Sequence, residues 1–152
     1  MKRIFLLIGL ILATVIGVSA QEVVEKDGIY YFDSKPYTGS YIGTFENGNT
    51  KFSLFLKNGK KDGEMKVYFE SGKLNEIRHY KKNEMDGTWV TYNENEVQVG
   101  LANYKDGQKN GEWKVWDDQG NLIYEMNYAN GEKSGTWKKF DAAGKILSER
   151  TF

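Results

Sequence analysis

Apolar and polar residues alternate along several short segments of the chain, and the clearest case runs from residue 50 to residue 56. In an extended strand, successive side chains point to opposite faces, so such alternation predicts one apolar and one more polar face. One face would carry Thr50, Phe52, Leu54 and Leu56, the other Lys51, Ser53 and Phe55, and Leu122, Tyr124, Met126 and Tyr128 repeat the first pattern. Segments of six or seven residues between turn signals have the length of β-strands rather than of helices.

These segments recur with a fixed period, which is marked by glycine. The marking glycines are spaced by 24 residues without an insertion: Gly39, Gly63, Gly87, Gly111 and Gly135. A constant period of this length indicates a repeat architecture, in which each unit packs against its neighbours.

Three further positions of the unit are mostly aromatic. Two residues after the glycines stand Tyr41, Met65, Trp89, Trp113 and Trp137, and seventeen after them stand Leu56, Tyr80, Tyr104, Tyr128 and Phe152. Five residues after the glycines stand Thr44, Tyr68, Tyr92, Trp116 and Phe140. We expect the tryptophans and the tyrosines of the first two rows to form a cross-strand ladder that holds the units together.

Each unit contains two turn signals, an inner and an outer one. The inner turns read Asn47-Gly48, Ser71-Gly72, Asn95-Glu96, Gln119-Gly120 and Ala143-Gly144. The outer turns run from Asn58-Gly59 to Gly63, from Asp106-Gly107 to Gly111 and from Asn130-Gly131 to Gly135, while in the second unit Asn83 replaces the first glycine. A residue with a side-chain oxygen precedes every marking glycine (Thr38, Asp62, Asp86, Asn110 and Ser134), and we expect it to fasten the turn.

Two strands joined by a short turn make a β-hairpin, which is only marginally stable when isolated in water. Stacking hairpins side by side pairs their backbones and layers their aromatic side chains. The predicted fold class is therefore all-β, with tandem 24-residue β-hairpin repeats stacked into an elongated, twisted antiparallel ribbon or rod.

The N-terminal part divides into two predicted regions ahead of the five repeats of residues 37–152. Residues 1–20 begin with Lys2 and Arg3, continue with an apolar run and end at Val18-Ser19-Ala20, the pattern of a cleaved secretory signal peptide. The alternative is an uncleaved membrane anchor, although the run is short for a span. Residues 21–36 are predicted to be a lead-in that contains a capping half-repeat strand. We therefore expect an exported protein, periplasmic or extracellular after cleavage near Ala20.

The unit Tyr104-Lys105-Asp106-Gly107, Asn110-Gly111-Glu112-Trp113, Trp116, Gly120-Asn121-Leu122 resembles the bacterial variant of the membrane occupation and recognition nexus (MORN) repeat, which also builds proteins named YwqK-type antitoxins. The lead-in Gly28-Ile29-Tyr30-Tyr31 with Lys35-Pro36-Tyr37-Thr38-Gly39 is similar to the N-terminal segment of such proteins. The resemblance implies a scaffold, a membrane-associated module or a toxin-neutralising partner. Two units match the repeat less well. The first has Tyr41 and Thr44 at the aromatic positions, and the third lacks an inner glycine and has Gly100 inside a strand. These departures would mark a bulge, a partner site or sequence drift.

Composition narrows the classes of partner and of chemistry that the chain can have. Without Lys2 and Arg3 the chain has 19 basic and 21 acidic residues, and this balance does not predict a basic surface for nucleic acid or for a membrane. The absence of cysteine excludes disulfides and thiol catalysis.

Catalytic and metal-binding patterns are weak. Asp106, Gln108, Asn110 and Asp117 approach the order of a calcium loop, but strands instead of helices flank them, and the second and third units have Phe69 and Asn93 at the place of Asp117. The single histidine, His79, has no partner set for catalysis. We expect neither an enzyme nor a cofactor nor a bound metal.

Aromatics three residues apart in a flat strand point to opposite faces, so one row is a candidate binding stripe: Tyr68, Tyr92, Trp116 and Phe140. The leading hypothesis is a non-catalytic, exported scaffold or adaptor that binds another protein, with no nucleic acid as partner. Glycan recognition through the aromatic row and membrane-surface association remain open alternatives. Self-association through edge strands near Tyr30 and near Leu147 to Phe152 is a further possibility.

Overall fold

The computed structural model describes residues 22–152, so the predicted signal peptide, residues 1–20, lies outside the described residues. The described part is all-β and contains no helix. Its strands are β1 (Val24–Lys26), β2 (Ile29–Phe32), β3 (Lys35–Pro36), β4 (Gly39–Thr44), β5 (Thr50–Lys57), β6 (Lys60–Tyr68), β7 (Leu74–Lys81), β8 (Glu84–Met85), β9 (Gly87–Tyr92), β10 (Gln98–Lys105), β11 (Gln108–Lys109), β12 (Gly111–Trp116), β13 (Leu122–Ala129), β14 (Glu132–Phe140) and β15 (Ile146–Thr151).

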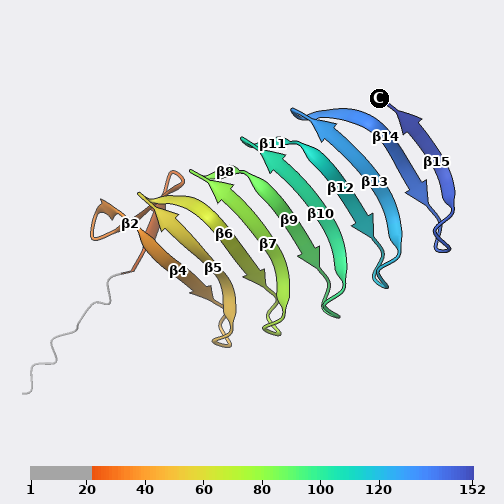
Figure 1. The fold of residues 1–152 in the computed structure, drawn as a ribbon. Helices are drawn as coiled ribbons and strands as arrows, with labels where there is room; N and C mark the ends of the chain where they lie inside the picture. The colour runs from red at the N-terminus through yellow and green to blue at the C-terminus, as the bar shows by residue number, and fades with distance from the viewer. Residues whose placement is uncertain (1–21) are drawn as a thin grey trace, which may run out of the picture.

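The five hairpins form one long open sheet. Its neighbours follow the order of the chain from β4 to β15, every pair is antiparallel, and the short strands β8 and β11 pair with β7 and β10. Figure 1 shows the strands arranged side by side along a curved ribbon whose two ends are not joined. The predicted fold class is confirmed.

The outer turns are tight two-residue turns. At Asp106 and Gly107 the φ angles are 47° and 78°, and both central residues are also left-handed at Asn58-Gly59, Lys82-Asn83 and Asn130-Gly131. This is the type I′ geometry, which matches the twist of antiparallel strands and favours Asn, Asp and Gly. The replacement of glycine by Asn83 fits this requirement.

The inner turns use a second device. Glu96 has a φ of 62° at the place where the other units have glycine, so its conformation repeats without the usual residue. In the last three units an Asn or Asp at the end of the first strand accepts backbone hydrogen bonds from its own turn; Asp117 Oδ1, for example, accepts from Gln119 N at 2.9 Å and from Asn121 N at 2.8 Å. Hydrogen bonds from Asn121 and the turn amides lower the pKa of the Asp117 carboxyl.

The marking glycines do not lie in the tight turns, and this corrects their placement from sequence. Leu54 pairs with Met65 but Leu56 pairs with Lys61, so the intervening residues of β6 bulge out of the ladder. The bulge gives Gly63 a φ of 102°, and Gly111 has a φ of 93° at the equivalent position. Residues that carry a side chain rarely adopt this backbone conformation, which explains why the 24-residue period is marked by glycine.

A second irregularity lies near the inner turn of every unit. In the fourth unit Val115 pairs with Tyr124 but Trp116 pairs with Leu122, so the register shifts by one residue. The same shift occurs in the other four hairpins. The bulge considered for the first and third units is therefore a feature of all five hairpins, and the pairing near the inner-turn aromatics is not that of a flat, regular hairpin.

In four of the five units the polar residue before the marking glycine bonds to the next outer turn and not to its own turn. Thr38 Oγ1 accepts a hydrogen bond from Asn58 N at 2.8 Å. Equivalent hydrogen bonds, each between residues 20 positions apart in the sequence, join the next outer turn to the carboxylates of Asp62 and Asp86 and to the side-chain amide of Asn110. These residues fasten neighbouring hairpins to one another.

The lead-in forms a separate three-stranded sheet of β1, β2 and β3. Tyr30 N donates to Gly59 O at 2.8 Å, and Asn83 Nδ2 donates to Gly28 O at 2.7 Å, so the lead-in is tied to two outer turns. It packs over the first two hairpins, where Leu56 is fully buried with Leu54 and Met65. The N-terminal edge of the ribbon is therefore β4 and not, as expected, the strand near Tyr30.

Candidate binding face

Strand pairing places the aromatic rows on one side of the sheet, which we call the ladder face. Directly paired residues share a face, and Trp89, Trp113 and Trp137 pair with or adjoin Ala102, Met126 and Arg150. The rings form an unbroken ladder through Tyr80, Trp89, Tyr104, Trp113, Tyr128, Trp137 and Phe152, with centroid distances of 5.4, 5.0, 5.2, 5.2, 5.1 and 5.0 Å. Most neighbouring rings are tilted by nearly 60°, as aromatic pairs prefer.

The indole N–H of each ladder tryptophan donates a hydrogen bond to a backbone carbonyl near the glycine bulge. Trp113 Nε1 donates to Asn103 O at 3.0 Å, and Trp89 and Trp137 donate to His79 O and Asn127 O at 3.0 and 2.9 Å. Asn103 O and His79 O also accept backbone hydrogen bonds, from Asn110 N at 2.9 Å and from Asp86 N at 3.0 Å, so the indole is a second donor to these carbonyls. The expected structural role of the tryptophans thus includes a hydrogen bond that aromatic spacing alone does not reveal.

The ladder is only partly buried over the last three units. Its tryptophans and tyrosines from Trp89 to Trp137 are half-buried, whereas the residues below the lead-in are closed off. The surroundings are nevertheless apolar enough that burial raises the pKa of the Tyr104 hydroxyl.

Cations lie over the rings of the ladder face. Lys109 Nζ is 4.4 Å from the ring centre of Trp113 and 4.8 Å from that of Tyr128. Lys133 Nζ is 4.5 Å from that of Trp137. The same face holds Lys61 over Tyr80, Arg78 over Trp89, Lys139 over Tyr124 and Arg150 over Phe152. Cations are attracted to the negative faces of aromatic rings, so the lysine row and the ladder support each other.

The charges of the sheet are unequally divided between its two faces. Each hairpin of residues 39–152 has a regularly paired stretch between its glycine bulge and the register shift near its inner turn. In these stretches strand pairing places one carboxylate on the ladder face, that of Glu76, which is paired with Arg78. Between the bulges on the opposite face, three lysines are matched by glutamates: Lys66 with Glu64, Lys114 with Glu112 and Lys138 with Glu125. A chain of formal net charge zero therefore presents a cationic aromatic face, which the sequence analysis did not expect.

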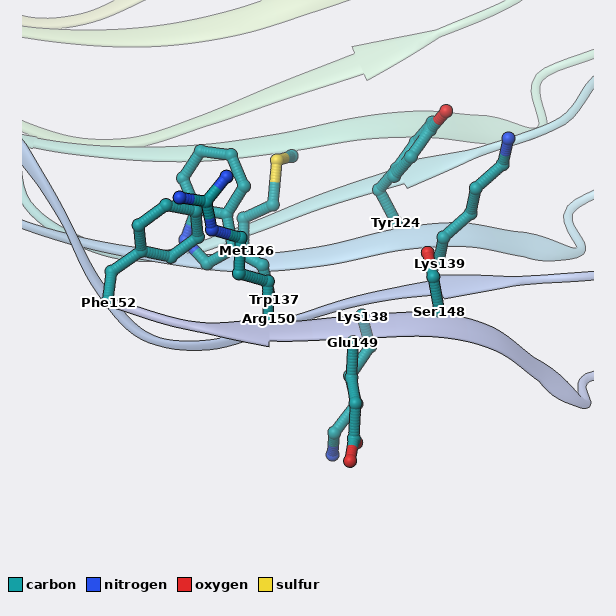
Figure 2. A pocket seen from close by; sticks show the side chains of 9 residues that line it. All are labelled: Tyr124, Met126, Trp137, Lys138, Lys139, Ser148, Glu149, Arg150 and Phe152. Carbon is teal, nitrogen blue, oxygen red and sulfur yellow. The ribbon is translucent and has the colours of Figure 1, made fainter.

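A shallow groove of about 400 Å³ lies at the C-terminal end of the ladder face. Figure 2 shows Tyr124, Met126, Trp137 and Phe152 on the upper side of the strands, with Lys138 and Glu149 on the opposite side. Lys139 lies beside Tyr124, and Arg150 lies over Phe152. The groove combines an apolar floor with two cations.

The row predicted to form a binding stripe lies beside the inner turns. Tyr68, Tyr92, Trp116 and Phe140 end the first strands of their hairpins, directly after the register shift, and all four are half-buried. They are no more open than the ladder rings, and their role in binding stays a prediction.

The residues considered for calcium are not brought together. Asp106 lies in an outer turn and Asp117 in an inner turn, with β12 extended between them. His79 lies on the opposite face, and its Nδ1 is 2.6 Å from Thr88 O. Asn103 occupies the equivalent position in the next unit and donates to Glu112 O. Within residues 22–152 no group of three or more acidic or histidine side chains is placed to hold a metal ion. That part of the chain also has no helix of the length and apolarity needed for a membrane span.

The comparisons with known proteins agree with the hairpin repeats. No curated protein gave a significant match. The two hairpins that fall largely outside the family matches are the first and the third, the units whose sequences depart from the pattern. Three segments, residues 61–82, 109–130 and 133–152, match the family model of the MORN repeat variant, and each covers most of one hairpin of the ribbon.

Proposed function

We propose that this protein is a non-catalytic, exported repeat scaffold or adaptor that binds another protein through its ladder face. The observation that carries the proposal is the open aromatic ladder of the last three units, which is half-buried and has no covering layer among residues 22–152. Aromatic side chains with cations are the residue types that dominate protein interfaces. MORN repeats are in general associated with protein and membrane binding.

The shape of the ribbon supports this role. A stable protein interface needs about 800 Å² on each partner. The ladder face continues without interruption from Tyr80 to Phe152 across seven stacked rings, so a partner can contact several equivalent positions at once. Binding of a toxin, as by the YwqK-type antitoxins, is one form that such an interaction can take and rests on analogy alone.

Association with an anionic membrane surface is a second candidate function. The cations of the ladder face favour it, because basic side chains near a surface attract anionic headgroups. Glycan recognition has less support, because lysine ammonium groups already cover ring faces on which sugars would stack.

Site-specific crosslinking in the native host tests the proposed function. A photoreactive phenylalanine analogue replaces Tyr124 on the ladder face, Trp116 in the predicted stripe, or Ile42 on the opposite face, where 58% of the side chain is exposed. We expect one protein to crosslink from Tyr124 and not from Ile42. Crosslinking from Trp116 alone would move the binding surface to the predicted stripe.

Uniform or absent crosslinking from all three positions would contradict the proposal. The N-terminal residue of the purified protein tests export separately: a chain that begins at Gln21 supports cleavage, and one that retains residues 1–20 contradicts it.

A further inference from the structure

The ladder face carries a pattern of charge that identifies the chemistry of its partner. Of its six ring-facing cations, Arg78 has a carboxylate partner in Glu76, while Lys61, Lys109, Lys133, Lys139 and Arg150 have no ion-pair partner among residues 22–152. On the opposite face Lys66, Lys114 and Lys138, between the bulges, are paired with glutamates. Lys57, Lys60, Lys81 and Lys105, beside the outer turns of that face, have no ion pair among residues 22–152 but do not lie over the ladder rings. Unpaired cations held over aromatic rings, on a face with a single carboxylate between the bulges, are complementary to an acidic ligand.

We propose that the ladder face binds an acidic, extended segment of a partner protein. Carboxylates of the segment pair with Lys109 and Lys133, and one of its apolar side chains fills the groove between Tyr124 and Phe152. This inference rests on the proposed protein-binding function and specifies the chemical class of the partner.

The two lysines are held in defined positions. Lys109 lies over the rings of Trp113 and Tyr128, and Lys133 lies over those of Trp137 and Phe152, so their ammonium groups repeat in the same place in successive units. The two positions are separated by two strand spacings, or about 10 Å. A polyproline II segment advances about 9 Å in three residues and returns its side chains to the same side. Acidic residues three apart in such a segment therefore match the two lysines.

The groove supplies the apolar part of the site. It lies on the same face, between Tyr124, Met126, Trp137 and Phe152, and its volume of about 400 Å³ is large enough for an apolar side chain. Lys133 contacts Trp137 and Phe152, so the cationic position and the groove share two side chains. An acidic segment with apolar residues between its carboxylates would contact both.

The same geometry favours a polypeptide over a sugar polymer or a lipid surface. Sugar stacking on Trp113 or Trp137 would have to displace Lys109 or Lys133, which a peptide carboxylate can instead approach directly. A membrane would contact ring edges that project from the face, but the ladder rings pack on one another and are half-buried.

The test measures binding of a labelled peptide by fluorescence anisotropy. The peptide consists of repeated Glu-Pro-Leu triplets, which favour polyproline II and place an acid at every third residue, and its controls replace Glu by Gln or by Lys. We expect only the Glu peptide to bind, and binding to weaken as salt concentration rises. The double variant Lys109→Gln with Lys133→Gln should lose about tenfold or more in affinity.

Two matched variants separate the site from overall charge and from folding. Lys114→Gln with Lys138→Gln removes the same charge from the opposite face and should leave the affinity unchanged, and Lys109→Arg with Lys133→Arg should retain binding. Equal binding of the Glu and Gln peptides, or equal losses in the two Gln double variants, would overturn the inference while a protein-binding function still stands. The inference also fails if no peptide binds.

A vesicle arm distinguishes failure of the inference from failure of the proposed function. Vesicles that contain phosphatidylserine are tested for binding that depends on Lys109 and Lys133. Both proposals fail if such vesicles bind, no peptide binds, and Tyr124 crosslinks to no protein. Membrane association then replaces them.

Discussion

The first two hairpins and the last three use the same 24-residue unit but bury it differently. In the first two, Leu54, Leu56 and Met65 form a closed apolar core under Tyr30 and Tyr37 of the lead-in. In the last three, no lead-in covers the sheet, and the positions of Leu56 and Met65 hold large aromatics that pack on one another and under lysines. These two positions therefore hold aliphatic side chains where they are closed off, and aromatics that remain stable when half exposed where they are not.

The difference extends to hydrogen bonding. Trp113 donates its indole N–H to the carbonyl beside the bulge, and the equivalent Met65 has no such donor. The first two units are tied to the lead-in by a different bond, from Asn83 Nδ2 to Gly28 O. The two regions thus use different side-chain hydrogen bonds, and substitutions can separate their contributions.

Leu56→Ala should have the largest effect on stability. The side chain is fully buried, so its removal leaves a cavity and should cost about 3 kcal/mol in the free energy of unfolding. Urea denaturation measures the loss, and hydrogen exchange should show it mainly in β4 to β6. Ile42→Ala, at an exposed position, serves as the control, and equal losses in the two variants would refute a closed core in the first two units.

Asn83→Gly should destabilise the protein although it introduces the glycine that other outer turns carry. The side chain donates to Gly28 O at 2.7 Å and accepts from Lys61 N at 2.7 Å, and loss of both bonds should cost about 1.5 kcal/mol. Thermal unfolding measures it, with Gly107→Asn as the reciprocal control where no lead-in is present. A stability gain in Asn83→Gly would show that turn conformation outweighs the tie to the lead-in.

Trp113→Phe keeps an aromatic ring in the ladder but removes the indole donor to Asn103 O. The lost hydrogen bond should reduce the free energy of unfolding by about 1 kcal/mol. Tyr128→Phe, which retains the neighbouring ring, should change it by less. If both variants unfold like the parent protein in a denaturant titration, ring packing alone holds the last three units.

Lys133→Gln should have the smallest effect on folding. Its ammonium group lies over two partly exposed rings, and a cation–π contact of this kind contributes about 0.5 kcal/mol. The midpoint of thermal unfolding should fall slightly and the far-ultraviolet circular dichroism spectrum should stay unchanged. A large loss would assign Lys133 to the structure of the ladder and not to ligand recognition.

Much of the architecture could be predicted from sequence because it depends on local chemistry. Alternation predicted the strands, the turn residues predicted the hairpins, and the period predicted their stacking, since each depends on residues close in the chain. The marking glycines were recognised but assigned to turns, because a bulge and a turn both call for a residue that tolerates a positive φ. Only strand register distinguishes the two.

The candidate binding face could be predicted only in part. The sequence determined the hairpin repeat and the aromatic rows by itself, because turn residues and alternating side chains act within one unit. The tertiary structure alone decided which face carries lysines over the aromatic rings, that the lead-in covers the first two units, and that Asp62 and Asp86 bond to neighbouring turns. These features depend on strand register and on residues about 20 positions apart, and a one-residue bulge is enough to change which side chains meet.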